Sequence, residues 1–146
     1  MNILVINGPN LNLLGLREPE LYGRATYDDL VAKIRAEGGK QGVKTEFVQS
    51  NHEGVLIDAI QDAYHKFDGI IINPGAYTHT SIALLDALKA AGVPAVEVHI
   101  TDPDTREEFR RTSYIRAACI ATIKGRGLDG YLVALRLLTK GPAVSG

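Results

Sequence analysis

Residues 3–6 read Ile-Leu-Val-Ile, and residues 7–15 read Asn-Gly-Pro-Asn-Leu-Asn-Leu-Leu-Gly. The apolar run has the length and β-branching of a strand. The segment after it, residues 7–24, is rich in Gly, Pro and Asn and far exceeds the median connection of about 4–6 residues. Loops of that length usually serve as lids or binding loops. We therefore predict a catalytic loop at the end of the first strand, with Arg17 and Tyr22 near its tip.

Strand and helix patterns alternate along the rest of the chain. Further strands are predicted over residues 43–49, 69–72, 94–99 and 120–124, and helices over residues 27–37, 56–67, 82–91, 105–111 and 128–138. Strands separated by helices predict βαβ units and a parallel sheet with helices on both faces. We therefore expect one α/β domain over residues 1–146, a flavodoxin-like doubly wound sandwich with a five-stranded parallel sheet in the order 2-1-3-4-5.

Several helix ends and buried faces are predicted from single residues. Gly38-Gly39 is expected to end the first helix. Tyr64 continues the apolar face of the second helix, and Ile82 is expected to face inward from the third. Thr80 or Ser81 caps that third helix.

Composition excludes several classes of protein. The chain has 146 residues, 45% hydrophobic and 23% charged, which is ordinary for one globular domain. The formal net charge is -1 and the sequence has no run of basic residues, so nothing indicates a basic surface that would bind nucleic acid. The single Cys119 cannot form an intrachain disulfide and is expected to be a small core residue. Without a signal-peptide pattern or an apolar stretch of roughly 20 residues, we expect a cytoplasmic protein that does not enter a membrane, with a frayed tail over residues 140–146.

Polar residues cluster where the predicted strands end, at residues 7–12, 50–53, 73–79 and 97–101. In doubly wound sheets, ligands bind outside these carboxyl ends, near the switch point between strands 1 and 3. The active-site hypothesis therefore depends on topology as well as on residue type.

Glu97 and His99 lie two residues apart on a strand, so their side chains leave the same face. A carboxylate beside an imidazole favours the protonated ring and fixes its tautomer, which suits a general acid. The alternative is an idle pair at an exposed strand end, but an idle pair in a covered strand would be costly.

Tyr22 is the candidate base. A phenol, with a pKa of about 10, is a poor base at neutral pH unless cations lower that pKa. Arg17 lies in the same loop, and Arg106 or Arg110 could approach from the exit of strand 4. The alternative is an aromatic side chain that only packs the loop down.

Other polar residues fit a site for a small carboxylic acid. Asn10 and Asn73 stand in Gly/Pro turns, where Asn also serves turn chemistry. His79 is expected at a helix N-terminus, where free N–H groups favour anions. Arg106 and Arg110 are expected on one face of a short helix, at i, i+4 spacing.

Competing functions lack their motifs. No Gly-x-Gly-x-x-Gly or P-loop follows strand 1, so dinucleotide and nucleoside-triphosphate binding are not indicated. A phospho-receiver domain should carry Asp at the end of strand 3, where this chain has Asn73. A metal site built from His79, Glu97 and His99 lacks compact ligand spacing. We therefore expect no metal and no cofactor, and a non-catalytic domain that binds a small carboxylate stays the alternative.

Six motifs in order carry a family resemblance, and they cover residues 7–12, 14–19, 22–23, 73–81, 97–99 and 106–110. Over essentially its whole length, the chain closely resembles the type II 3-dehydroquinate dehydratases of the shikimate pathway. The resemblance implies a lyase of chorismate and aromatic amino acid biosynthesis, which converts 3-dehydroquinate to 3-dehydroshikimate. It implies syn elimination of water through an enolate without a Schiff base, and a homo-oligomer that is a dodecamer of four trimers.

The resemblance also assigns the catalytic residues. Tyr22 is implied to remove the C2 proton, and Arg17 to lower the pKa of Tyr22. His99, oriented by Glu97, is implied to protonate the departing C1 hydroxyl. Asn10 is implied to hold a water near the enolate oxygen.

Substrate-binding residues follow in the same way. Asn73 and the backbone N–H groups of Ile100 and Thr101 are implied to bind the carboxylate and a nearby hydroxyl. His79 and Arg110 are implied to hold ring hydroxyls. Thr101 replaces the usual Ser, and its backbone role is retained.

Two further residues are implied to act at moving or shared parts of the site. Asp86 is implied to reach the site of a neighbouring subunit, and Arg106 to close with the lid over residues 17–24. The chain departs from the family pattern at residues 102–105 and 114–119.

Overall fold

The computed structural model describes residues 1–16 and 18–140, apart from the side chains of residues 21 and 22. Its sheet has five parallel strands in the order β2-β1-β3-β4-β5. The strands are β1 (Asn2–Asn7), β2 (Lys44–Gln49), β3 (Gly69–Asn73), β4 (Ala95–His99) and β5 (Ala121–Lys124). The predicted α/β fold and strand order are confirmed, and each strand lies within one residue of its predicted bounds.

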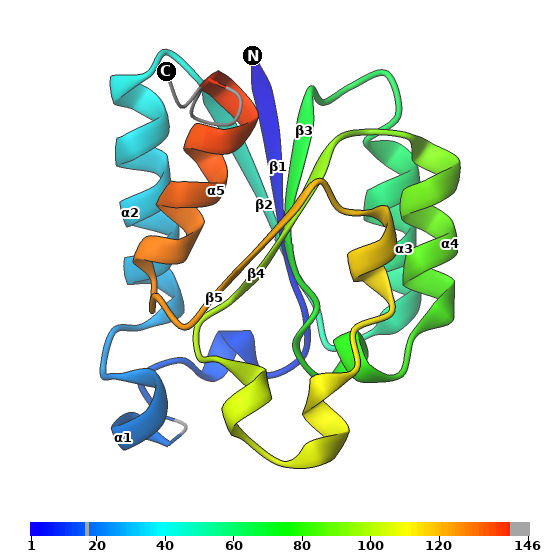
Figure 1. Ribbon diagram of the computed structural model, residues 1–146. Helices are drawn as coiled ribbons and strands as arrows, with labels where there is room; N and C mark the ends of the chain where they lie inside the picture. Colours follow the sequence, from blue (N-terminus) through cyan, green and yellow to red (C-terminus); the bar gives the residue numbers. More distant parts are fainter. Residues whose placement is uncertain (17, 141–146) are drawn as a thin grey trace, which may run out of the picture.

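Helices cover both faces of this sheet (Figure 1). Helices α2 (Tyr27–Lys40) and α5 (Asp129–Lys140) lie on one face, and α3 (Glu53–Asp62) and α4 (Ile82–Ala91) lie on the other. One apolar core forms on each face. The central strands β1 and β3 are covered on both sides, which explains why they read as nearly continuous apolar runs.

Two predicted helix ends are wrong. Helix α2 runs through Gly38-Gly39 to Lys40. Gly38 is retained inside the helix because the chain packs closely there: a Cβ on it would lie 3.1 Å from Thr45 Cγ2. Helix α3 ends at Asp62, so Tyr64 lies beyond it and is 56% exposed instead of lying on the buried face.

The start of α4 agrees with the prediction in its cap but not in the orientation of Ile82. Ser81, and not Thr80, is the N-cap, and its Oγ accepts a hydrogen bond of 3.0 Å from the Leu84 N–H. This cap sets the rotation of the helix so that Leu84 is buried and Ile82 is 55% exposed. Gly92 ends α4 in the left-handed conformation, as glycine commonly does at the C-terminus of a helix.

The predicted helix over residues 105–111 is replaced by two 3-10 turns. These are η3 (Pro103–Thr105) and η4 (Glu108–Arg111). The Asp102 side chain caps η3 and Pro103 starts it, so the turn forms earlier than the charged run suggested. Arg106 then has extended backbone, with φ -104° and ψ -158°, so it shares no helical face with Arg110.

The exits of β1 and β3 pack main chain against main chain. The Gly8 N–H donates to the Asn73 carbonyl at 2.8 Å, and a Cβ on Gly8 would lie 2.3 Å from the Pro74 oxygen. On the other side, a Cβ on Gly75 would lie 2.9 Å from the Pro9 oxygen. These two loops therefore meet without intervening side chains, at the switch point of the sheet.

The long first loop contains two short helices. These are η1 (Leu11–Leu13), which follows directly from β1, and α1 (Pro19–Tyr22), which stands apart from the sheet near its carboxyl edge (Figure 1). Within residues 1–16 and 18–140, no helix has both the length and the apolar character needed to cross a bilayer.

Candidate active site

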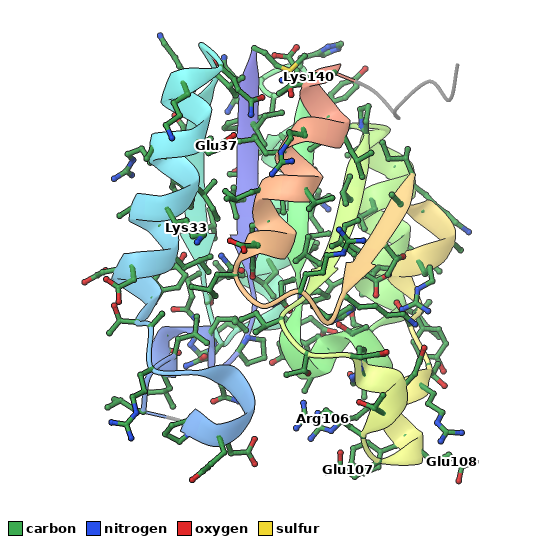
Figure 2. All side chains as sticks on the ribbon, turned by 60° about the vertical axis from the view of Figure 1, so that its left-hand side comes forward. Lys33, Glu37, Arg106, Glu107, Glu108 and Lys140 are labelled. Carbon is green, nitrogen blue, oxygen red and sulfur yellow. The ribbon has the colours of Figure 1, made fainter. Side chains whose placement is uncertain are left out.

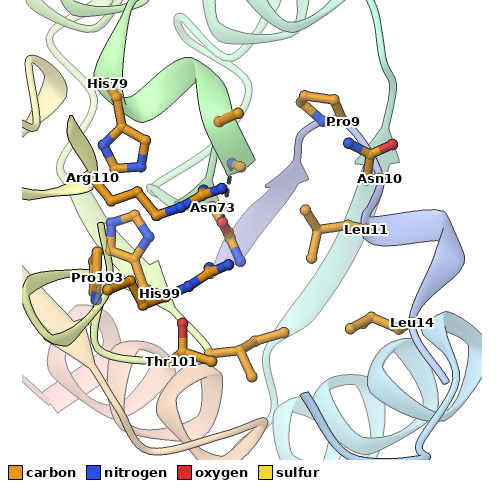
Figure 3. Close-up of a pocket in the computed structure, with 14 residues that line it drawn as sticks. Pro9, Asn10, Leu11, Leu14, Asn73, His79, His99, Thr101, Pro103 and Arg110 are labelled. Carbon is orange, nitrogen blue, oxygen red and sulfur yellow. Dashed lines mark hydrogen bonds between the residues drawn. The ribbon is translucent and has the colours of Figure 1, made fainter. Parts of the chain in front are cut away.

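A cavity of about 260 Å³ opens at the carboxyl ends of β1, β3 and β4. It brings together eight predicted site residues: Asn10, Asn73, His79, His99, Ile100, Thr101, Arg106 and Arg110. His79, His99 and Arg110 stand on one side of it, and Pro9, Asn10 and Leu11 on the other (Figure 3). Among the described residues that line the cavity, the ionisable side chains are arginines and histidines and none is a carboxylate, which favours an anionic ligand.

Four further predicted residues are not among the described residues that line this cavity. Arg17 and the side chain of Tyr22 lie outside the described residues, although the backbone of Tyr22 ends α1. Asp86 is exposed on α4, and Glu97 is buried behind His99.

The lid approaches the cavity through an ion pair. Glu18 Oε2, at the start of α1, lies 3.8 Å from Arg106 Nη2. Figure 2 shows Arg106 pointing from its segment toward the side on which α1 lies, while Glu107 and Glu108 stand at the outer edge. Arg106 thus connects the exit of β4 with the first loop.

Glu97 and His99 form a buried hydrogen-bonded dyad. Alternation along β4 places both side chains on one face, and His99 Nε2 lies 2.5 Å from Glu97 Oε2. Burial alone would raise the pKa of Glu97, but hydrogen bonds from His99 and Arg116 outweigh it and lower that pKa from 4.5 to about 2. Glu97 is therefore ionised and supports a proton on the imidazole, whose Nδ1 is left for the cavity.

Three residues that sequence reasoning missed complete the surroundings of Glu97. They are Ser113, Arg116 and Thr122, each of which donates to the carboxylate. Thr122 is the β5 partner of Glu97 in the sheet, so the strand register could have indicated it. Ser113 lies between two 3-10 turns and Arg116 lies within one of them, where no periodic pattern indicates either residue.

His79 has a defined tautomer. It is the last residue of η2 (Gly75–His79), and not at the start of α4 as predicted. Its Nδ1 lies 2.7 Å from the Thr112 carbonyl, which can only accept, so Nδ1 carries the proton. Burial lowers the pKa of His79, and the positive charges of His99 and Arg110 lower it further, despite the opposing effect of the Thr112 carbonyl. A neutral His79 presents Nε2 as an acceptor for a ligand hydroxyl.

Asn73 is held by a buried polar chain. Its Nδ2 donates to Tyr131 Oη at 3.0 Å, and Tyr131 donates to Asn7 Oδ1 at 2.6 Å. The Oδ1 of Asn73 accepts a hydrogen bond from the Gly75 N–H at 3.1 Å. Since an amide nitrogen has two N–H groups, the second one is left for a ligand. Burial raises the pKa of Tyr131, which stays neutral. Sequence reasoning missed Tyr131 because it stands in a leucine-rich helix.

The backbone after β4 is oriented from behind. The Ile100 carbonyl accepts from the Gly127 N–H at 3.0 Å, so the N–H of Thr101 in the same trans peptide points the opposite way. Lys124 pairs with Asp104 and lies 3.8 Å from Asp102, which anchors the divergent 102–105 stretch to β5. This stretch therefore packs against the sheet, while Arg106 beyond it meets the lid.

A metal centre is not indicated in the described part of the chain. Across residues 1–16 and 18–140, no group of three or more His, Cys, Asp or Glu side chains could hold a metal ion. The arrangement instead offers a buried acid–base dyad, cationic side chains and neutral donors around a small cavity.

Comparison with known proteins agrees over nearly the whole chain. The sequence model of the class II dehydroquinases matches residues 1–139. The 3-dehydroquinate dehydratase of Clostridium acetobutylicum is 55% identical over 138 residues, which are 94% of this chain and 96% of that protein. The crystal structure of a type II dehydroquinase from Butyrivibrio crossotus superimposes with a TM-score of 0.93 and 49% identity, covering 94% of this chain and 97% of that one. A second type II dehydroquinase, from Propionibacterium acnes, gives a TM-score of 0.92 with 42% identity, covering 95% and 96% of the two chains.

Proposed function

The chain belongs to the class II dehydroquinase family, and from this premise we propose that it dehydrates 3-dehydroquinate by syn elimination through an enolate. Family membership makes the chain an enzyme of the hydro-lyase class that serves aromatic biosynthesis. The observation that supports the proposed mechanism is the Glu97–His99 dyad at the wall of a cationic cavity.

The proposed first step removes the C2 proton. Tyr22 takes it as general base, with Arg17 lowering the pKa of Tyr22, and the C–H electron pair moves onto the carbonyl oxygen to form the enolate. Asn10 lines the cavity in a left-handed conformation, with its N–H bonded to Asn51 Oδ1 at 3.0 Å. It is suited to hold a water against the enolate oxygen.

The proposed second step expels water. The enolate electrons return to form the C1–C2 double bond, the C1–O bond breaks, and the leaving oxygen takes the His99 proton. Glu97 stabilises the imidazolium until transfer. The products are one enone and one water, and Tyr22 and His99 exchange protons with solvent to complete the cycle.

Different groups in the cavity would bind the carboxylate and the ring hydroxyls of the substrate. Asn73 and the N–H groups of Ile100 and Thr101 receive the carboxylate and a nearby hydroxyl. His79 and Arg110 hold ring hydroxyls, and the Nε of Arg110 is fixed by Glu107 at 2.6 Å.

The proposal includes assembly and location. We expect a cytoplasmic dodecamer of four trimers. Asp86, exposed on α4 away from its own cavity, would act at the site of a neighbouring subunit.

Following enone absorbance after adding 3-dehydroquinate tests the function. Growth of the absorbance supports the enzyme, whereas saturable binding without it would support a non-catalytic carboxylate-binding domain. Since none of the described residues that line the cavity is lysine, activity should also resist borohydride added with substrate. Inactivation by borohydride would indicate imine chemistry instead.

A further inference from the structure

The Glu97 carboxylate receives more donors than its dyad with His99 needs. Arg116 donates from Nε to Oε1 and from Nη2 to Oε2, each at 3.2 Å. Ser113 Oγ reaches Oε2 at 2.9 Å, and Thr122 Oγ1 reaches Oε1 at 3.3 Å. Together with His99 these donors number more than the roughly four lone-pair positions of a carboxylate, so they compete for it.

Arg116 acts from outside the cavity. Its side chain is 38% exposed, while that of Glu97 is fully buried, and Arg116 does not line the cavity wall. Its two-pronged hydrogen bond therefore reaches Glu97 from a partly exposed position outside the cavity. Any influence of Arg116 on the reaction passes through the carboxylate.

The position of Arg116 is built into the fold. It stands in η5 (Ile115–Ala118), whose first residue is fully buried in the core shared with α4. Just before this turn, the Tyr114 N–H donates to the Thr78 carbonyl at 3.1 Å, and after it the Ile120 N–H donates to the Ala95 carbonyl at 2.8 Å. Because hydrogen bonds fix the backbone on both sides of η5, placing the guanidinium against Glu97 costs little conformational entropy.

Other charged groups near the dyad do not take over this role. His79 and Arg110 line the cavity beside His99, and Arg110 pairs there with Glu107. Lys124, beside His99 in the sheet register, is paired with Asp104.

The neighbouring thiol is also uncharged. Burial, and then the charge of Glu97, raise the pKa of Cys119 to about 12. Arg116 is thus the cation that neutralises the Glu97 carboxylate directly. Its hydrogen bonds to Glu97 raise the pKa of Arg116 itself, so its charge is permanent.

We propose that Arg116 is a positioning residue for the acid step, one that fixes Glu97 toward His99 and weakens the stabilisation that the carboxylate gives to the imidazolium. This inference rests on the proposed role of His99 as the acid. With its charge shared by a guanidinium, Glu97 orients the ring through Nε2 without stabilising the imidazolium so strongly that transfer of the Nδ1 proton to the leaving hydroxyl is slowed.

Replacing the guanidinium tests this proposal. Arg116→Met should lower kcat about tenfold with KM nearly unchanged, and should leave exchange of the C2 proton at the wild-type rate. The alkaline limb of the kcat profile should move up by about one pH unit, because the carboxylate then stabilises the imidazolium without competition from a guanidinium. Arg116→Lys keeps the positive charge but not the two-pronged hydrogen bond to Glu97. It should therefore return the alkaline limb to its wild-type position and recover part of kcat. Arg136→Met, at an exposed position of α5, is the matched control and should behave as wild type.

A measurement without turnover separates this inference from the proposed function. The imidazole of His99, identified among the four histidines by comparison with His99→Asn, is titrated by NMR in ligand-free protein. It should lose its proton at higher pH in Arg116→Met than in wild type, even if the enzyme assay were to fail. An unchanged titration and an unchanged alkaline limb would overturn the proposal, as would a variant in which only KM or thermal stability changes. If Arg116→Met does not fold, Arg116→Gln takes its place under the same criteria.

Discussion

Tyr131 and Asn7 are joined by a hydrogen bond of 2.6 Å although 124 residues separate them in the chain. The bond links the last helix to the end of the first strand beneath the cavity. Tyr131 Oη also accepts a hydrogen bond from Asn73 Nδ2, so this core side chain fixes the position of a residue that lines the cavity. The hydroxyl of Tyr131 thus has both a structural and a functional consequence.

Removing that hydroxyl should lower both stability and substrate affinity. Tyr131→Phe leaves Asn7 Oδ1 and Asn73 Nδ2 without their partner in a buried place, which costs about 1–3 kcal/mol of unfolding free energy. It should also raise KM, since Asn73 is released to rotate. Denaturant unfolding and steady-state kinetics measure the two effects. Tyr64→Phe, at an exposed tyrosine, should change neither, and an unaltered Tyr131→Phe enzyme would refute the linkage.

The base and the acid should be separable by isotope exchange. Tyr22→Phe should lose about 10²–10⁴-fold in kcat with KM little changed, and should lose exchange of the C2 proton as well. His99→Ala should slow water loss similarly while exchange continues, because the base is intact. Enone absorbance and deuterium incorporation at C2 in heavy water report the two steps. Near-wild-type turnover of Tyr22→Phe would remove it from the role of base.

Glu97 should make stability depend on acid pH. Its pKa is lowered to about 2 in the folded protein, against 4.5 ordinarily, so its ionised form stabilises the fold above about pH 4.5. That contribution is lost as the pH falls toward 2. The difference in unfolding free energy between wild type and Glu97→Gln should therefore be on the order of a few kcal/mol near pH 6 and shrink below pH 4.5. Exposed Glu108→Gln is the control, and a difference that stays constant with pH would contradict the assignment.

Two glycine substitutions should act in opposite directions. Gly8→Ala places a methyl group against the Pro74 main chain and should destabilise the fold by more than about 2 kcal/mol. Gly39→Ala, inside α2 with open space around its Cβ, should stabilise it by about 0.5–1 kcal/mol. Thermal unfolding compares the two, and equal effects would show that the close approach at Gly8 is relaxed in solution.

Asp86 should matter only in the assembly. Asp86→Asn should reduce activity of the oligomer, whereas Asp62→Asn, at an exposed position on the neighbouring α3, should not. Sedimentation-linked assays measure activity and size together. A fully active monomer would contradict the proposed contribution from a neighbouring subunit.

Local patterns in the sequence predicted the sheet and part of the site. Glu97 and His99 were identified together because a strand repeats every two residues and both flanks are apolar. Helix α2 was predicted too short because Gly38 signals an end locally, while packing against Thr45 keeps it helical. Tyr131 and Arg116 were missed because their value depends on partners 58 and 19 residues away, Asn73 and Glu97, and no periodicity records such contacts.

The main-chain contact between Gly8 and Pro74 also limits how this enzyme can change. Main chain in contact with main chain cannot be reshaped one side chain at a time, since any larger residue at Gly8 or Gly75 collides with the opposite loop. The rim over residues 100–112 has no such constraint, because 3-10 turns and extended backbone present exchangeable side chains there. Evolution or engineering toward other cyclic carboxylic acids therefore has the rim to vary, while the contact between the two loops stays fixed.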